Sequence, residues 1–115
     1  MPNPEADFLS AYIECALWSS IDDNDEPLDR NFSRDSLTGE ALLKMIQDCR
    51  AFREQAGITI LRDMWRAGHD FWLSRNGHGA GFFDGHWGEY SNKLQELAKS
   101  FGECNLIVNG EELCL

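Results

Sequence analysis

The segment Gly68–Trp87 reads GHDFWLSRNGHGAGFFDGHW and holds all three histidines of the chain together with five of its ten glycines. Glycines mixed with large rings and a few polar groups indicate close backbone turns around buried aromatic side chains. Residues 69–74 alternate between two faces as a strand does, and residues 80–84 follow as a possible partner strand. Between them, Asn76-Gly77 and Gly79 supply the positive φ angles of a hairpin turn. We therefore predict a β-hairpin here, near the centre of the fold.

Two amphipathic helices are predicted at the N-terminal end of the chain. Asn3 followed by Pro4 is typical of a helix start, and apolar residues then repeat at helical spacing from Phe8 to Leu17, which predicts a helix from about Pro4 to Trp18. Thr38 is a good N-cap for a second helix, which is expected to end before Gly57. The N-terminal half of the chain is thus expected to be helical.

The stretch from residue 58 to residue 66 fits both helical and strand patterns, and we favour a helix that ends near Gly68. Residues 90–101 form another clear amphipathic helix, with Gly102 at the position that follows a helix C-terminus. This helix is expected to cross the sheet.

A second hairpin is predicted at the C-terminal end, where Asn109-Gly110 separates residues 104–108 from residues 111–115. A two-residue turn there pairs Val108 with Glu111 and Leu106 with Leu113. The predicted fold is one α+β domain over residues 1–115, with N-terminal helices packed on a small, mainly antiparallel sheet and one crossing helix.

The chain of 115 residues has a net charge of −10, and the charge is unevenly distributed. Residues 1–40 contain ten acidic and two basic residues, a net charge of −8, and most of these acids lie in a predicted acidic loop at 19–37. Such a charge repels nucleic acid and anionic membranes and attracts a basic protein surface. Direct nucleic-acid binding is therefore disfavoured, and a partner with a basic surface is favoured.

The remaining composition indicates a cytoplasmic protein without a cofactor. No apolar run approaches the length of a membrane span, and the N-terminus has no pattern of a secretory signal. The four cysteines form no C-x-x-C pair and are expected to be reduced thiols: Cys15, Cys49, Cys104 and Cys114.

The histidines and neighbouring carboxylates allow two kinds of enzymatic site. His69, His78 and His86 would be metal ligands if they met at one end of the predicted hairpin, although no metal-binding spacing is present. His78 with Asp70 or Asp84 would be an oriented general base. A small metal-dependent or acid–base enzyme with its site at residues 69–86 is therefore the alternative hypothesis.

The segment 69–84, HDFWLSRNGHGAGFFD, resembles a signature of small acidic proteins encoded by tailed bacteriophages and prophages. Residues 16–20, the acidic stretch 22–28 and residues 98–108 are also similar to that group. The resemblance extends from Tyr12 to Val108. It implies a phage accessory gene, and it carries over neither an activity nor catalytic residues.

The leading functional hypothesis is a non-enzymatic binding protein that blocks a host protein, such as a defence or nucleic-acid enzyme. An acidic face fits a groove built for phosphates because it presents the same sign of charge. The sequence is compatible with both a monomer and a dimer. The residues expected to contact the partner are the acids of the loop and two groups at the rim of the central hairpin: Asp22, Asp23, Asp25, Glu26, Asp29, Asp35, Arg75 and His78.

Overall fold

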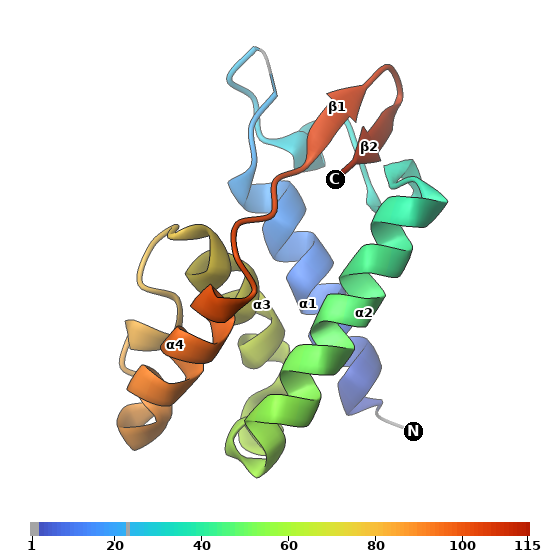
Figure 1. Cartoon of the computed structure of the whole chain (residues 1–115). Coiled ribbons are helices and arrows are strands. Elements are labelled where there is room, and N and C mark those ends of the chain that lie inside the picture. The colour runs from blue at the N-terminus through green and yellow to red at the C-terminus, as the bar shows by residue number, and fades with distance from the viewer. Residues whose placement is uncertain (1–2, 23) are drawn as a thin grey trace.

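The computed structural model describes residues 3–22 and 24–115, and these residues form a mainly helical fold with a small antiparallel sheet (Figure 1). The α-helices of this described part are α1 (Pro4–Ser19), α2 (Gly39–Ala56), α3 (Met64–Asn76) and α4 (Ser91–Ser100). Short 3₁₀ helices lie between them: η1 (Leu28–Arg30), η2 (Arg34–Ser36), η3 (Gly57–Asp63), η4 (Gly81–Phe83) and η5 (Gly88–Tyr90). The sheet consists of β1 (Ile107–Asn109) and β2 (Glu112–Cys114).

The start signals of the first two helices are confirmed. The Asn3 side chain accepts a hydrogen bond from the backbone N–H of Ala6 at 3.2 Å, and Thr38 Oγ1 accepts one from Ala41 N–H at 3.1 Å. These bonds satisfy backbone donors that have no partner within the helix. Helix α2 ends where expected, at Gly57, whose φ is 63°.

The predicted central hairpin is wrong, because residues 69–74 belong to helix α3. The Asp63 side chain caps this helix by accepting from Arg66 N–H at 3.0 Å. Gly77, with φ 68°, lies just beyond its C-terminus, and His78 N–H closes the last turn on the Leu73 carbonyl at 2.9 Å. The predicted partner strand at 80–84 is the 3₁₀ helix η4 and its flanks. The positive φ angle at Gly77 therefore ends a helix instead of making a strand turn.

Gly68 lies inside α3 at a close crossing with α1, and the predicted helix end at this residue is wrong. A β-carbon at Gly68 would lie 2.1 Å from the Phe8 carbonyl oxygen, so only glycine allows this approach of the two backbones. Aromatic rings fill the space around the crossing. The Phe52 and Phe71 rings stack at 4.2 Å between centroids, and Tyr12 meets Trp72 edge to face at 5.3 Å.

The C-terminal hairpin is confirmed, but its register differs by two residues from the prediction. Val108 pairs with Leu113 and Asn109 with Glu112, so Gly110 and Glu111 form the turn. Leu113 is fully buried, and its carbonyl accepts from Thr38 N–H at 2.9 Å. Docking of Leu113 against the start of α2 therefore fixes a register that the hairpin sequence alone does not specify.

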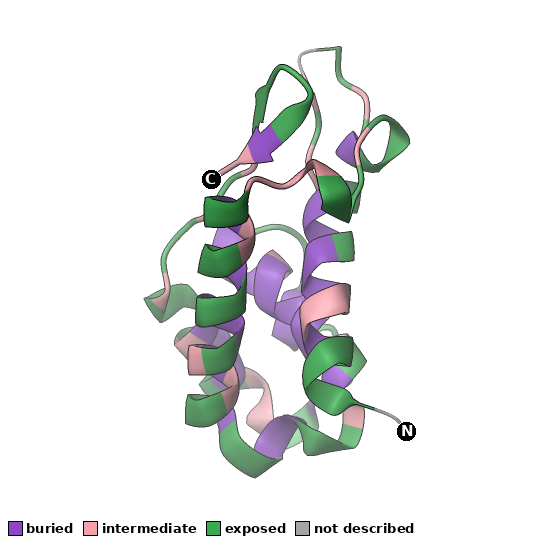
Figure 2. Cartoon of the chain, turned by 90° about the vertical axis from the view of Figure 1, so that its right-hand side faces the viewer, coloured by how far each residue is buried: buried purple, intermediate pink, exposed green. Residues whose placement is uncertain are grey.

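The helices pack chiefly on one another and do not form a layer over a sheet. Figure 2 shows buried residues on the faces where the helices meet and exposed residues on their outer faces. The hairpin and the loop after α1 lie together at the end of the molecule opposite the N-terminus (Figure 1). Within residues 3–22 and 24–115, no helix has both the length and the apolar character needed to span a bilayer.

Candidate functional site

Arg75 is a buried structural residue. The residue is 4% exposed. Its guanidinium donates to the Tyr12 hydroxyl at 2.9 Å and to Asp48 Oδ2 at 2.8 Å. It also donates to the carbonyls of Phe101 and Gly102, at the C-terminal end of α4. The prediction that Arg75 contacts a partner is wrong, because the guanidinium is enclosed by these groups.

Other polar side chains of α3 also join the helix to distant segments. Trp72 Nε1 donates to the Oγ atom of Ser19, the last residue of α1, at 2.9 Å. The Ser74 hydroxyl donates to Gln95 Oε1 on α4 at 2.6 Å, and Asn76 Oδ1 accepts from Cys104 N–H at 2.7 Å. These buried polar side chains of α3 therefore belong to the scaffold of the fold, and their hydrogen-bonding groups are satisfied.

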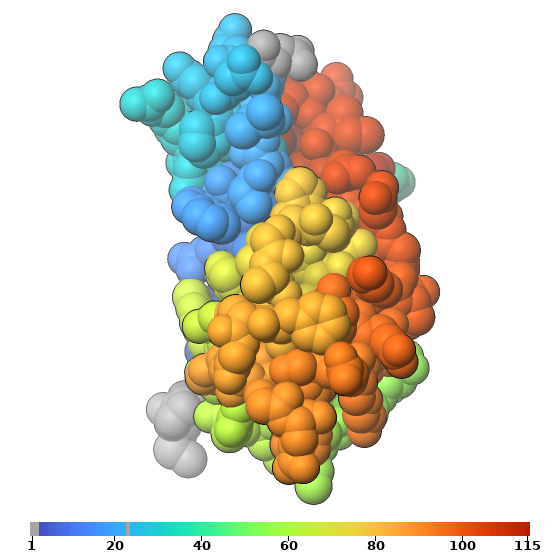
Figure 3. Space-filling view, turned by 90° about the vertical axis from the view of Figure 1, so that its left-hand side faces the viewer, coloured from blue at the N-terminus to red at the C-terminus, as the bar shows by residue number. Residues whose placement is uncertain are grey.

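Asp70 is a buried carboxylate, 1% exposed, at the N-terminal half of α3. It accepts hydrogen bonds from Trp87 Nε1 at 2.7 Å, from Arg66 Nε at 3.2 Å and from His69 Nδ1 at 3.2 Å. Arg66 also forms an ion pair with Asp84. These contacts hold the segment after η4 against α3. Figure 3 shows the yellow to orange part of the chain on the surface beside the blue N-terminal part.

The three histidines do not meet. His86 Nε2 lies 3.1 Å from Asp63 Oδ2 at the start of α3, whereas the exposed His78 follows the other end of the helix. His69 and the end of α3 are about 10 Å apart along the helix axis at 1.5 Å per residue. In the described ranges, no group of three or more His, Cys, Asp or Glu residues is arranged to hold a metal ion.

The alternative enzymatic sites centred on His78 are therefore wrong in their geometry. The carboxylates of Asp70 and Asp84 contact Arg66, and within the described residues His78 forms no side-chain hydrogen bond or ion pair with either of them. The imidazole that does meet Asp70 is that of His69.

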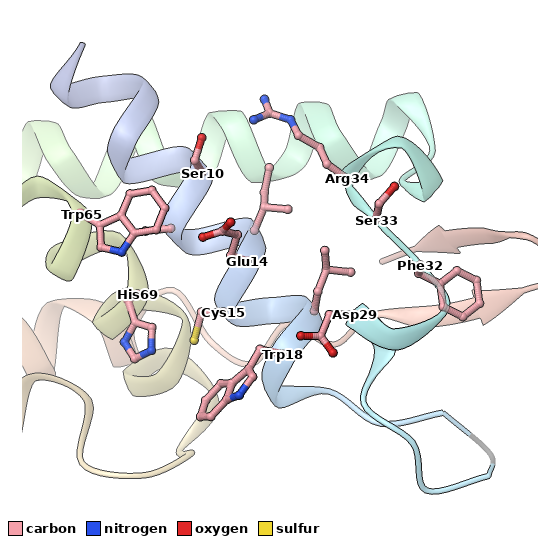
Figure 4. A pocket seen from close by; sticks show the side chains of 13 residues that line it. Ser10, Glu14, Cys15, Trp18, Asp29, Phe32, Ser33, Arg34, Trp65 and His69 are labelled. Atoms are coloured by element: carbon pink, nitrogen blue, oxygen red, sulfur yellow. The ribbon is translucent and has the colours of Figure 1, made fainter. Parts of the chain in front are cut away.

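An open groove of about 570 Å³ lies beside His69. One wall is the outer face of α1, a second comes from the start of α3, and a third comes from residues 29–34, as Figure 4 shows. Two tryptophans contribute exposed rings to it: Trp18 is 59% exposed and Trp65 is 46% exposed. The other lining residues are Ser10, Ala11, Ile13, Glu14, Cys15, Leu17, Asp29, Phe32, Ser33, Arg34 and His69.

The groove lining includes three hydrogen-bond acceptors, the carboxylates of Glu14 and Asp29 and the imidazole of His69. Glu14 and Asp29 are exposed carboxylates, and neither is ion-paired with another described residue. Because a carboxylate only accepts, Asp70 accepts a hydrogen bond from His69 Nδ1, and in the neutral imidazole with this tautomer Nε2 is an acceptor. The His69 ring lies 6.2 Å from the Trp18 ring.

Cys15 also lines the groove but is unsuited to nucleophilic chemistry. Burial, together with the nearby charge of Asp70, raises the pKa of the Cys15 thiol to about 12. The thiol therefore stays protonated at neutral pH, and the thiolate is the reactive form.

The acidic loop divides into carboxylates with a local structural role and carboxylates that face solvent. Asp22 Oδ1 accepts from the backbone N–H groups of Asn24 at 2.8 Å and Glu26 at 3.1 Å, which closes a turn. Glu26 lies 3.7 Å from Arg30. The exposed members without an ion pair in the described part of the chain are Asp25, Asp29 and Asp35. Asp23 lies outside the described residues.

Sequence reasoning missed the groove and its residues Glu14, Trp18 and Trp65. A signal for them was present: Glu14 and Trp18 are four residues apart on α1, as are Trp65 and His69 on α3. Residues at that spacing share one helix face. Trp18 also lies outside the apolar face of its helix, so its ring is not part of the hydrophobic core.

Comparison of the chain with protein-family models, with curated proteins and with solved structures found no match in any of the three.

Proposed function

We propose that this chain is a small binding protein without catalytic activity that takes up a partner with a basic surface. The observation that carries the proposal is the contrast between two sets of polar groups. The polar side chains of α3 are engaged in internal hydrogen bonds, whereas Asp25, Asp29 and Asp35 are exposed and unpaired within the described residues. We call these three side chains the acidic surface.

Charge supports the same proposal. The net charge of −8 in residues 1–40 attracts a basic surface over a distance of about 8–10 Å at physiological salt. A partner that normally binds phosphates presents such a surface, and an acidic surface competes for it. With the phage-like signature at 69–84, this favours a phage-encoded protein that blocks a host enzyme in the host cytoplasm.

The test compares two triple variants that remove the same charge from different places. Asp25→Asn, Asp29→Asn and Asp35→Asn remove the acidic surface, and Glu89→Gln, Glu96→Gln and Glu103→Gln remove three exposed carboxylates from the region of α4. Each immobilised variant is used to capture proteins from a bacterial lysate, and bound proteins are eluted with increasing NaCl.

We expect the wild type and the α4 variant to retain the same partner to similar salt concentrations. The acidic-surface variant should lose that partner or release it at lower salt, because exposed charge pairs weaken with ionic strength. If the acidic-surface variant keeps every partner with unchanged elution, the proposal is wrong.

A further inference from the structure

We propose that the groove between α1, α3 and residues 29–34 binds an arginine side chain of the partner. This inference rests on the proposed function and names the chemistry of its anchor. The groove has a volume of about 570 Å³, which accommodates one long side chain with its flanking backbone.

The first feature that fits a guanidinium is the pair of exposed indoles. Trp18 and Trp65 are 59% and 46% exposed and lie on different helices that border the groove, as Figure 4 shows. By contrast, Trp72 and Trp87 are buried, and their N–H groups are bonded to Ser19 and Asp70. Tryptophan is the best ring for a cation–π contact, and a planar guanidinium stacks on it as well.

The second feature is a set of three hydrogen-bond acceptors in the lining. The carboxylates of Glu14 and Asp29 and the Nε2 lone pair of His69 all belong to the lining. Asp70 is 1% exposed and accepts from His69 Nδ1, so the buried carboxylate orients the imidazole. A guanidinium has five N–H donors in a fixed plane and no acceptor, which matches such a set.

The third feature is the sign of the charge. Two carboxylates, those of Glu14 and Asp29, and one guanidinium, that of Arg34, line the groove. Glu14 lies between Trp65 and Trp18 in Figure 4, so the end of the groove with the two indoles carries a carboxylate. A cationic side chain complements this end, and a carboxylate or phosphate does not.

The experiment is an NMR titration of ¹⁵N-labelled protein with the peptide acetyl-Gly-Arg-Gly-amide. The readout is the indole N–H signal of each of the four tryptophans. We expect saturable shifts of Trp18 and Trp65 and none of Trp72 and Trp87, which serve as internal controls. The same peptide with citrulline in place of arginine keeps the shape without the charge and should cause no shift.

Two single variants of exposed lining residues give opposite expectations. Glu14→Gln should weaken binding of the arginine peptide about two- to fivefold, because one exposed charge pair is lost. Arg34→Gln should strengthen it by a similar factor, because a like charge is removed. Equal shifts with the citrulline peptide, equal affinity for a lysine peptide, or a change of the same sign in both variants would overturn the assignment of the groove to arginine.

The experiments distinguish a failure of the arginine-groove assignment from a failure of the proposed function. The double variant Asp25→Asn, Asp35→Asn alters the acidic surface outside the groove lining and should bind the arginine peptide almost as the wild type does. Peptide binding without charge-dependent partner capture would support the groove and contradict the proposed function. Charge-dependent capture with unmoved Trp18 and Trp65 signals would overturn the groove and leave the proposed function standing.

Discussion

The guanidinium of Arg75 on α3 donates a hydrogen bond to the carboxylate of Asp48 on α2, with 2.8 Å between Nη1 and Oδ2. The same nitrogen donates to the hydroxyl of Tyr12 on α1. Burial raises the pKa of that tyrosine well above its usual value, against the lowering effect of the Arg75 charge. One side chain thus ties together α1, α2 and α3, and its bonds to Phe101 and Gly102 add the end of α4.

Arg75→Leu should lower the free energy of unfolding by about 3–5 kcal/mol, because it removes one of the two cationic partners of the largely buried Asp48 carboxylate, which keeps Lys44, and leaves two carbonyls without their donor. The matched control is Arg50→Leu, which breaks an exposed ion pair with Glu54 and should cost less than about 1 kcal/mol. Urea unfolding of both variants measures the difference. Equal decreases in the free energy of unfolding would show that the Arg75 contacts stabilise the fold no more than an exposed ion pair does.

Gly68→Ala should destabilise the protein, although alanine is the better helix former by about 1 kcal/mol. The new β-carbon would meet the Phe8 carbonyl and force α1 and α3 apart, at a cost of about 1–3 kcal/mol. At Gly39, also in a helix, a β-carbon has no atom within 4 Å. Gly39→Ala should therefore leave the melting temperature unchanged or raise it. A Gly68→Ala protein as stable as the wild type would contradict the close crossing.

His78→Ala should change stability by less than about 0.5 kcal/mol, since an exposed side chain is removed from a helix terminus. Asp70→Ala should cost about 1–3 kcal/mol or more, because it leaves the buried indole N–H of Trp87 without its acceptor. Thermal unfolding of the two variants compares them. A large loss in His78→Ala would mean that this histidine has a buried partner.

Three cysteine thiols should be slow to alkylate in the native protein at pH 8. Burial raises the pKa of Cys15 to about 12 and also raises those of Cys49 and Cys104. At a pKa of 12, about one Cys15 thiol in ten thousand is a thiolate at pH 8, and this fraction rises as the pH rises toward the pKa. Mass spectrometry after iodoacetamide treatment should find Cys114 modified first. All four should react in urea, and rapid native labelling of Cys15 would contradict its burial.

The sequence predicted the helices whose ends carry local signals. The side chains of Asn3 and Thr38 and the position of Gly102 act on neighbouring backbone, so their roles follow from sequence alone. The acidic charge of residues 1–40 was equally readable. What these features share is that no distant residue is needed to interpret them.

Helix α3 was misread because its polar residues are buried. Asp70, Ser74, Arg75 and Asn76 lie inside beside Phe71 and Trp72, so the usual contrast between an apolar and a polar face is lost. Their partners come from α1, α2, α4 and the segments before and after α4, which a single-sequence pattern does not bring together. The groove was missed for the same reason, since its walls are residues from three separate segments.

The central claim is that the carboxylates of Asp25, Asp29 and Asp35 serve binding, whereas the polar groups of α3 serve folding. The most direct measurement is urea unfolding of the triple variant Asp25→Asn, Asp29→Asn, Asp35→Asn beside the wild type. We expect an equal or higher free energy of unfolding, by up to about 1 kcal/mol, because exposed like charges are removed and no internal bond is lost. A decrease of more than about 1 kcal/mol would contradict the claim, because it would show that these carboxylates stabilise the fold.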